Sequence, residues 1–396
     1  MFSAFFGGQL KAVSAVKPIT IIGGGLAGLT LGIGLRQRKV PVTIWEAGQY
    51  PRHRVCGEFI SGRGQEVLVR LGLKDTLTQA GATEAGTAAF FLGEGRSPAR
   101  PLRPPALCLS RFRMDACLAA RFRECGGELQ ENQRWRDGAS GEGLVRANGR
   151  QLQPVDGGWR WLGLKVHARN IALIADLEMH GLDDGYVGLC RLQGGEVNVC
   201  GLFRSRKVAS GKSQVASQLR RQPSRCNVKA SGSSLSETNA DSGHGTGAGH
   251  REVFALLLGP QGTLLHERLA GATFDEDTFC AVAGFSIRPR RASAQSECCI
   301  GDALTMIPPV TGNGMSMAFE SAELAVEPLA AYSGGEISWP EARGALAGAC
   351  DRVFARRLAW ARWLQRLMFA PALRGRLGKV MLRSGLVWRM MFARTR

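Results

Sequence analysis

The feature that most constrains this chain is a glycine-rich turn near its start. A β-branched run, Ile19 to Ile22, leads into the motif Gly23-x-Gly25-x-x-Gly28, and a helical stretch follows. In such a turn the first glycine permits the tight bend, the second lets a pyrophosphate lie against the backbone, and the third lets the helix pack closely on the strand. The positive end of the helix dipole then meets the phosphates. The motif therefore predicts a dinucleotide-binding turn.

A second apolar strand, Val40 to Trp45, completes a strand–helix–strand unit and ends at an acid, Glu46. Glu46 lies eighteen residues beyond Gly28, where a carboxylate can accept hydrogen bonds from ribose hydroxyls. A glycine-rich turn in some other α/β protein would not explain this acid. The residues that we expect to contact the dinucleotide are Gly23, Gly25, Leu26, Ala27, Gly28 and Glu46.

Length and composition set further bounds. A chain of 396 residues has room for two or three structural units, and a net charge of +18 implies an anionic partner, which could be nucleic acid, a membrane surface or a phosphate-bearing cofactor. The eleven cysteines include no C-x-x-C pair, so we expect reduced thiols in a cytoplasmic protein. The histidines show no metal-ligand spacing, which predicts no metal site. The start falls short of a signal peptide, and no apolar run is long enough to span a membrane.

A basic loop follows Glu46 and holds Cys56. Its Arg52 and Arg54 are either part of a solvated surface or neutralise the phosphates of the cofactor. Turn residues and apolar spacing then predict further elements. These are helices at about 63–71 and 111–125 and strands at 88–92 and 106–109.

From residue 159 the apolar pattern changes to that of strands. We predict strands at 162–168, 171–177 and 186–192, and a hairpin whose turn is Gln193-Gly194-Gly195. This indicates an antiparallel sheet, separate from the parallel sheet that begins at Ile19. Residues 205–251 are rich in Ser and Gly and show neither helical nor strand periodicity. This composition predicts a flexible insertion in this region.

A second strong motif lies between residues 299 and 322. A short strand is followed by Gly301-Asp302, a proline turn and Gly312-x-Gly314, and a helix then opens with small residues. Such a helix start is suited to bind an anion or the negative end of a dipole.

Together the two motifs resemble the FAD-dependent oxidoreductases built on the plan of para-hydroxybenzoate hydroxylase and geranylgeranyl reductase. In that family the first motif binds the ADP half of FAD. The resemblance implies that Asp302 binds the ribityl chain and that the helix after Gly314 faces the N1–C2=O edge of the flavin. The positions it implies as flavin contacts are Gly301, Asp302, Pro309, Gly312, Asn313, Gly314 and Met315.

Two other segments are similar to the same family. Arg54-Val-Cys56-Gly57-Glu58 resembles the Cys-Gly segment that approaches the isoalloxazine ring, and Ser110-Arg111 resembles the start of the helix whose arginine reaches the FAD phosphates. Cys56 is either a catalytic residue at the substrate face of the ring or a buried structural cysteine.

The chain also departs from the family. Ala147-Asn148-Gly149-Arg150 stands where many hydroxylases have Asp-Gly, and Leu304-Thr305 replaces a common histidine. Neither half of the chain holds a second nucleotide fingerprint. We therefore expect NAD(P)H, as the electron donor, to dock only transiently.

The expected fold is α/β, with an FAD-binding Rossmann-like domain of the glutathione reductase type, an antiparallel β-sheet substrate domain and a helical C-terminus. The FAD-binding domain is expected to be discontinuous, at 15–85, 105–155 and 280–335. Residues 86–104 and 156–279 would form the substrate domain, and 340–396 the basic amphipathic helical C-terminus.

The C-terminal tail carries twelve basic residues and one acid from Asp351 onward, with apolar residues at helical spacing. Two amphipathic helices are therefore expected. They either pack on the body with solvated outer faces or lie on an anionic membrane, which would place the protein at the inner membrane face. The tail holds no motif for base recognition, so we expect no nucleic-acid partner.

The expected function is that of an FAD-dependent oxidoreductase acting on an apolar substrate, which could be isoprenoid, lipid-like or polyketide-like. Hydride transfer from the reduced flavin to a carbon–carbon double bond is the first candidate. Hydroxylation of an aromatic or lipid-like substrate through a C4a-hydroperoxide is the alternative, and a non-catalytic flavin-binding protein is the third. No side chain is an obvious acid–base catalyst, as is usual where the cofactor carries the chemistry.

Overall fold

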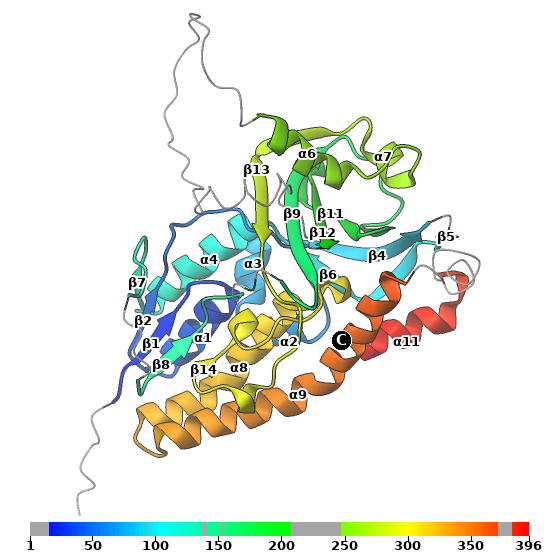
Figure 1. Ribbon diagram of the computed structural model, residues 1–396. Helices are drawn as coiled ribbons and strands as arrows, with labels where there is room; N and C mark the ends of the chain where they lie inside the picture. Colours follow the sequence, from blue (N-terminus) through cyan, green and yellow to red (C-terminus); the bar gives the residue numbers. More distant parts are fainter. Residues whose placement is uncertain are drawn as a thin grey trace, which may run out of the picture.

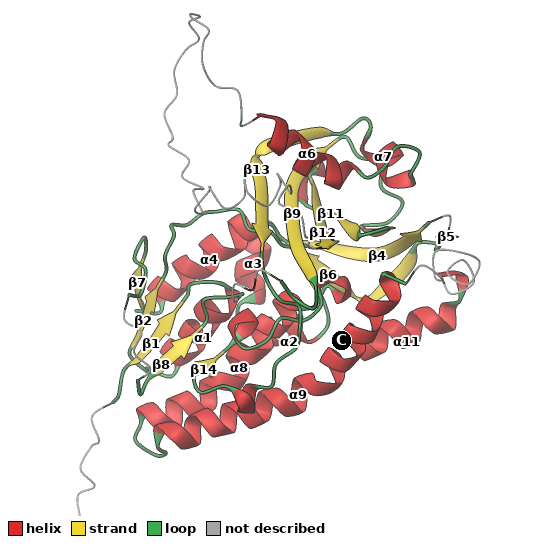
Figure 2. Ribbon diagram, viewed as in Figure 1, coloured by secondary structure: helices red, strands yellow, loops and turns green. Residues whose placement is uncertain are grey.

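The computed structural model describes residues 16–93, 95–136, 141–150, 153, 155–206, 247–370 and 382–395. They form a small parallel sheet with helices around it, a larger curved sheet, and a long C-terminal helix that runs past both (Figures 1 and 2). The predicted α/β class with an FAD-binding fold and a helical C-terminus is confirmed.

The small sheet contains the predicted strand–helix–strand unit. Its order is β14-β8-β1-β2-β7, and all neighbours are parallel. The register pairs Ile21 with Ile44 across β1 and β2, and both side chains are fully buried. The strands are β1 (Ile19–Ile22), β2 (Val42–Trp45), β7 (Glu128–Gln130), β8 (Leu144–Arg146) and β14 (Cys298–Cys299).

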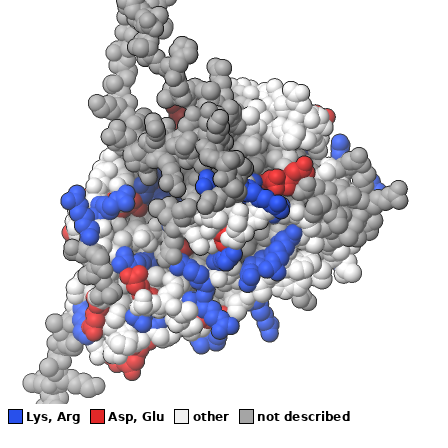
Figure 3. Space-filling view, viewed as in Figure 1, with Lys and Arg blue, Asp and Glu red and all other residues white. Residues whose placement is uncertain are grey.

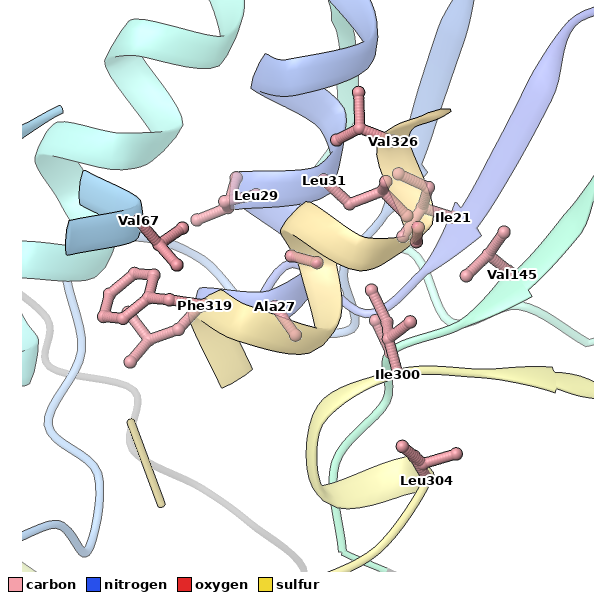
Figure 4. Packing of buried hydrophobic residues seen from close by; sticks show 14 of the residues in the cluster. Ile21, Ala27, Leu29, Leu31, Val67, Val145, Ile300, Leu304, Phe319 and Val326 are labelled. Atoms are coloured by element: carbon pink, nitrogen blue, oxygen red, sulfur yellow. The ribbon is translucent and has the colours of Figure 1, made fainter. Parts of the chain in front are cut away.

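Three helices pack around this sheet: α1 (Leu26–Gln37), α4 (Arg111–Glu124) and α8 (Gly314–Ser333). Figure 4 shows apolar side chains of α1 and α8 meeting those of β1 and β8. Two glycines in α1 permit the close contact: a Cβ atom on Gly34 would lie 2.7 Å from Val326 of α8, and one on Gly32 would lie 2.7 Å from Phe122 of α4. The second half of α1 is therefore packed closely against both α4 and α8.

The larger sheet has the order β13-β9-β12-β11-β10-β4-β6-β3, with β5 paired to β4. All its pairs are antiparallel except β10 with β4, so the sheet is mixed rather than wholly antiparallel as expected. β4 lies earlier in the chain than β10, with which it pairs. The strands are β3 (Phe59–Ile60), β4 (Thr83–Leu92), β5 (Gly95–Arg96), β6 (Arg100–Cys108), β9 (Trp159–Arg169), β10 (Leu177–Leu182), β11 (Gly185–Arg191), β12 (Val197–Arg206) and β13 (Thr273–Ala283).

The remaining helices cover one face of the larger sheet or border it. α6 (Gly247–Leu258) and α7 (Leu264–Leu269) pack on its outer face through Val253, Leu257 and Leu265. α2 (Arg63–Arg70) and α3 (Lys74–Gln79) connect β3 to β4. The C-terminus forms α9 (Trp339–Met368), which begins with a capping box at Ser338, and α11 (Gly385–Thr395). Within the described ranges, no helix combines the length and the hydropathy that a membrane span requires.

Most predicted elements are confirmed, including the helices after Gly28, at 111–124 and after Gly314, and the hairpin between β11 and β12. The strand expected at 171–177 is wrong: this segment is a connection, and β10 starts only at Leu177. β8 was not predicted, since it has three residues in a turn-rich stretch. Of the expected insertion at 205–251, residues 207–246 lie outside the part of the chain that the structure describes. Its first two positions end β12, and its last five belong to α6.

Candidate functional site

The glycines of the motif between β1 and α1 differ in their surroundings. At two of them a side chain would clash with the backbone, whereas the third faces open space. A Cβ atom on Gly28 would lie 2.0 Å from the carbonyl oxygen of Gly23. One on Gly23, whose φ is +106°, would lie 2.5 Å from the carbonyl oxygen of Ala147. A Cβ on Gly25 would meet nothing within 4 Å, and α1 begins at the next residue without a side-chain cap. Its first amide groups are therefore available to an anion.

The side chains of Leu26 and Ala27 point into the core, so only their backbone can face a ligand. Ala27 also joins the two motifs in space. A Cβ on Gly301, whose φ is +61°, would lie 2.8 Å from the Cβ of Ala27. The Gly301-Asp302 segment thus lies directly on the first turn of α1, although 274 residues separate it from Ala27 in the chain.

Glu46 follows β2, and its buried carboxylate lies beside the glycine turn. Oε2 accepts a hydrogen bond of 2.9 Å from the amide of Gly24, and Oε1 accepts one of 2.9 Å from the amide of Gly48. Arg52 pairs with Oε1 at 2.5 Å and Arg54 approaches Oε2 at 3.4 Å. Both arginines are therefore ion-paired and partly buried, and they hold the basic loop against the turn.

We expect Glu46→Gln to weaken FAD binding roughly tenfold, or about 1.4 kcal/mol, because the amide group cannot accept hydrogen bonds at both ends and no longer pairs with the arginines. Flavin fluorescence quenching would measure the dissociation constant. Glu131→Gln is the matched control, since Glu131 also holds this loop by accepting a 2.8 Å hydrogen bond from the amide of Tyr50. Equal effects of the two variants would contradict a role of Glu46 in binding.

Arg111, at the start of α4, is held by an acid of the same helix. Its Nε and Nη2 donate to the two oxygens of the fully buried Asp115, both at 2.8 Å. The Nε of Arg54 approaches Asp115 Oδ2 at 3.0 Å. Arg54 thus bridges Asp115 and Glu46, and this row of alternating charges leads from the glycine turn to the Cys56 loop.

The loop that carries Cys56 is fixed from two sides. Nδ2 of Asn198, on β12, donates a 2.9 Å hydrogen bond to the carbonyl oxygen of Cys56, and Arg150 donates one of 3.1 Å to that of Val55. Burial raises the pKa of the Cys56 thiol, although the nearby Arg111 guanidinium opposes the shift. Cys56 is therefore a neutral thiol at neutral pH rather than an activated thiolate.

Asp302 faces Arg150, whose Nε lies 3.6 Å from Oδ2. Burial raises the pKa of Asp302, and the arginines at 150 and 111 partly oppose this. Arg150 occupies the segment that departs from the family pattern, so it links that segment to both Val55 and Asp302. A pocket of about 290 Å³ opens here; its lining is Arg150, Gln153, Ser286, Arg288, Pro289, Arg290, Asp302 and Met306.

The second glycine loop leads into α8. Pro309 starts a single helical turn that ends at Gly312, whose φ is +66° and whose Cβ would lie 2.2 Å from the ring of Phe59. A Cβ on Gly314 would meet nothing within 4 Å, and α8 begins there without a side-chain cap. Asn313 is buried and accepts a 3.3 Å hydrogen bond from Ser61, while Met315 points into the core. This is a second open helix start.

Sequence reasoning missed a group of polar residues on the larger sheet. Lys165 and His167 alternate with Leu164 and Val166 on β9, so both point to the face opposite α6 and α7, where they meet Glu58 of the Cys56 loop. The signal was available: two charged or polar residues two positions apart in an apolar strand share a face. Among the described residues, no three His, Cys, Asp or Glu side chains are grouped as metal ligands, and the cysteines are free thiols.

The geometry suits a long ligand with phosphates in its middle. Gly25 and Gly314 provide two helix starts with open space before them, Glu46 lies beside the first, and the Gly301-Asp302 segment lies on the first turn of α1 through Ala27. A flavin adenine dinucleotide matches this set of donors and acceptors. The residues present therefore fit the cofactor that the sequence implied.

Comparison with known proteins agrees with this fit. Residues 17–154 match the FAD binding domain family. No curated protein matches the chain in sequence. Among solved structures, the flavin-dependent brominase Bmp2 is 16% identical with a TM-score of 0.66. The match covers 96% of this chain and 94% of the Bmp2 chain.

Two other structures are similar. The flavin-dependent halogenase CmlS is 16% identical with a TM-score of 0.65. The match covers 94% of this chain and 66% of the CmlS chain. PqsL of Pseudomonas aeruginosa, described as a probable FAD-dependent monooxygenase, is 13% identical with a TM-score of 0.62, with coverages of 92% and 98%. Residues 17–154 thus match an FAD-binding domain by sequence, and the whole chain shares the fold of these three structures.

Proposed function

We propose that this protein is an FAD-dependent oxidoreductase that reduces a carbon–carbon double bond of an apolar substrate by hydride transfer. The observation that carries the proposal is that the Gly301-Asp302 segment lies against Ala27 in the first turn of α1 and, through a 2.9 Å hydrogen bond from the amide of Gly301 to Ser321, against α8. The amides at Gly25 would hold the pyrophosphate, Glu46 the ribose, and Asp302 the ribityl chain. The amides at Gly312 and Gly314 would face the flavin ring. When bound, FAD supplies the electron transfer.

An apolar substrate is supported by an aromatic cluster beside Pro309–Gly312. Trp161 and Tyr186, on the face of the larger sheet that bears Lys165, pack with Val310 and with Phe369 beyond α9; the ring centroids of Trp161 and Phe369 lie 5.8 Å apart. Within the described residues, Trp161 Nε1, Tyr186 Oη and the amide of Gln365 are buried without a hydrogen-bond partner. Burial also raises the pKa of Tyr186, which keeps its hydroxyl protonated. Such groups would bind an apolar molecule that carries one or two polar groups.

The second candidate is oxygen-dependent hydroxylation of an aromatic or lipid-like substrate. It is favoured by the fold shared with halogenases and with PqsL, whose descriptions name oxidative chemistry or flavin dependence. A non-catalytic flavin-binding protein is the third outcome that the experiment below distinguishes.

The test is an anaerobic absorbance spectrum of the purified protein, followed by NADPH and then by air. A flavin spectrum that NADPH bleaches, and that returns in air without a transient species, supports a reductase with a nicotinamide donor. A transient absorbance band before the oxidised spectrum returns supports the hydroxylase. Bound flavin that no nicotinamide reduces, with no turnover of isoprenoid probes, favours a non-catalytic protein, and failure to bind FAD refutes the whole proposal.

We also propose peripheral contact with an anionic membrane through α9. Its inner face packs on the body through Phe354 and Leu358, whereas its outer face carries exposed arginines and Trp363, which is 44% exposed. Figure 3 shows Lys and Arg side chains over the lower part of this face, where α9 lies. The exposed arginines of α9 are Arg352, Arg356, Arg362 and Arg366.

With this cationic face, we expect the protein to float with anionic liposomes at low salt and to be released as salt screens the arginines, since each contributes on the order of 1 kcal/mol. Flotation on neutral liposomes is the control. A protein that stays wholly in the soluble fraction at low salt would rule out the contact, and the arginines would then be a solvated face.

A further inference from the structure

A charged cluster is buried between the larger sheet and the Cys56 loop. Lys165 Nζ lies 3.6 Å from Glu58 Oε1, and both side chains are fully buried. Glu58 Oε2 lies 2.7 Å from Nε2 of His167. Nδ1 of His167 lies 3.3 Å from Oε1 of Glu196, whose side chain is 25% exposed. These contacts form a continuous row of titratable groups from the interior to solvent.

The row also has a side branch. Lys165 Nζ lies 3.0 Å from Nδ1 of His53, whose ring stacks on Phe112. Burial, together with the charges of Lys165 and His167, lowers the pKa of His53 to about 4, so its ring is neutral and Nδ1 can accept a hydrogen bond from Lys165 Nζ. The side branch thus gives Lys165 a second partner besides Glu58.

The histidine in the row and the glutamate at its outer end have shifted pKa values. Although burial opposes it, hydrogen bonds to Glu196 and Glu58 raise the pKa of His167. The hydrogen bond from His167, against the opposing effect of burial, lowers the pKa of Glu196. His167, whose two ring nitrogens face Glu58 and Glu196, is therefore the residue of the row that can exchange a proton with both carboxylates. Within the described residues, the other titratable groups that face the row include Cys56, Arg111, Arg169, Cys190 and Cys200.

The cluster is directly attached to the loop that resembles the flavin-approaching segment. Register pairs Lys165 with Cys200 and His167 with Asn198, the residue that donates to the Cys56 carbonyl. The Oδ1 atom of Asn198 is buried and has no partner within the described residues. The row therefore lies on the same face of the larger sheet as this unpaired atom and as Trp161 and Tyr186.

Stability alone does not account for this arrangement. Removing a lysine and a glutamate from water carries a desolvation penalty that their attraction often fails to repay, and apolar residues of similar size usually stabilise a core as well or better. The opposite face of β9 has such a core, in Leu164 and Val166. The charges are thus better explained by a chemical role.

We propose that Lys165, Glu58, His167 and Glu196 form a proton-transfer path from solvent to the side of the sheet that faces the Cys56 loop, with Lys165 at its inner end. The inference rests on the proposed function, because reduction of a double bond takes one hydride and one proton. Bound FAD, reduced by a nicotinamide donor, would supply the hydride for one C–H bond. For the other, an N–H bond of Lys165 breaks, and water reprotonates the resulting amine through Glu196, His167 and Glu58.

The test measures the rate of proton exchange along the path, and it needs no substrate. In protein labelled with ¹⁵N-lysine, NMR gives the rate at which the Nζ protons of Lys165 exchange with solvent, and the loss of this signal in Lys165→Arg assigns it. We expect Glu196→Gln to lower the pKa of His167 and thereby to slow the exchange roughly tenfold, since fewer imidazolium groups form. Because Glu196 is at the rim, this variant should keep the fold, which its melting curve would verify.

A second carboxylate–histidine pair on the same sheet provides the matched control. Glu178 and His180 on β10 lie 2.9 Å apart and buried, but they face α7, where Arg268 pairs with Glu178. Glu178→Gln should leave the exchange of Lys165 unchanged. Exchange that is the same in Glu196→Gln as in the wild type, or that slows equally in Glu178→Gln, would overturn the path.

Measuring the exchange in both the FAD-free and the FAD-loaded protein separates the two proposals. Failure to bind FAD, with exchange that still depends on Glu196, refutes the proposed function and leaves the path. Normal FAD binding with exchange that is independent of Glu196 refutes the path alone.

Discussion

Gly25→Val is expected to reduce FAD affinity by roughly 100-fold or more, about 3 kcal/mol, while leaving the melting temperature of the FAD-free protein unchanged. Gly25 has φ −82° and ψ −172°, an extended conformation that valine adopts readily, and its Cβ would meet nothing within 4 Å. The new side chain therefore fits the protein but fills the space that the pyrophosphate needs beside the amides of α1. Isothermal titration with FAD and thermal unfolding of the FAD-free protein measure the two effects.

Gly28→Ala provides the contrasting control for this prediction. Its Cβ would lie 2.0 Å from the backbone oxygen of Gly23, so helix and strand must separate. We expect this variant to lose stability as well as FAD binding. If Gly25→Val bound FAD as tightly as the wild type, the open space at the start of α1 would not be the pyrophosphate site.

The second large effect is expected at the contact between α8 and α9. Arg357 donates to both oxygens of Glu320, at 2.6 and 2.9 Å, and both side chains are almost fully buried. Glu320→Ala should lower the free energy of unfolding by about 3–5 kcal/mol, because it leaves the guanidinium buried without a counter-charge. Denaturant unfolding would measure the loss. Because α8 starts at Gly314, looser packing of α8 would also weaken FAD binding.

The same helix offers the control for this second prediction. Glu323 pairs with Arg70, whose side chain is 53% exposed. Glu323→Ala should therefore lower the free energy of unfolding by no more than about 1 kcal/mol. The double variant Glu320→Leu/Arg357→Leu should recover most of the stability, since it leaves no buried charge unpaired. If Glu320→Ala and Glu323→Ala had equal effects, the buried pair would not be the main link between α8 and α9.

The elements that could be predicted are those with a strong local pattern. The glycine turn after Ile22, the helix at 111–124 and the turn at Gln193–Gly195 were found because each depends on a few adjacent residues. β8 could not be predicted, since three residues in a turn-rich stretch become a strand only by pairing with β1. The strand expected at 171–177 was wrong for a related reason: its apolar residues lie in a connection that ends at β10.

The site divides in the same way. The two glycine motifs and Glu46 were predicted from their spacing, and Asp302 from the family resemblance. The partner of Arg150 could not be, because Val55 lies 95 residues away and approaches it only in the folded chain. The pair of Arg111 with Asp115 is different, since an i,i+4 spacing within a predicted helix indicates it. The buried cluster around Lys165 was also missed, since its acid, Glu58, lies more than one hundred residues earlier in the sequence.

By itself, then, the sequence determined the strand–helix–strand unit, the two open helix starts and the cationic C-terminal helix, because backbone freedom at glycine and the spacing of apolar side chains are local properties. Only the tertiary structure decided that Gly301 lies on Ala27, that Arg150 faces Asp302, and that Lys165 and His167 meet Glu58. These contacts join residues far apart in the chain. Strand order and the packing of the two sheets select them, and no local pattern encodes either one.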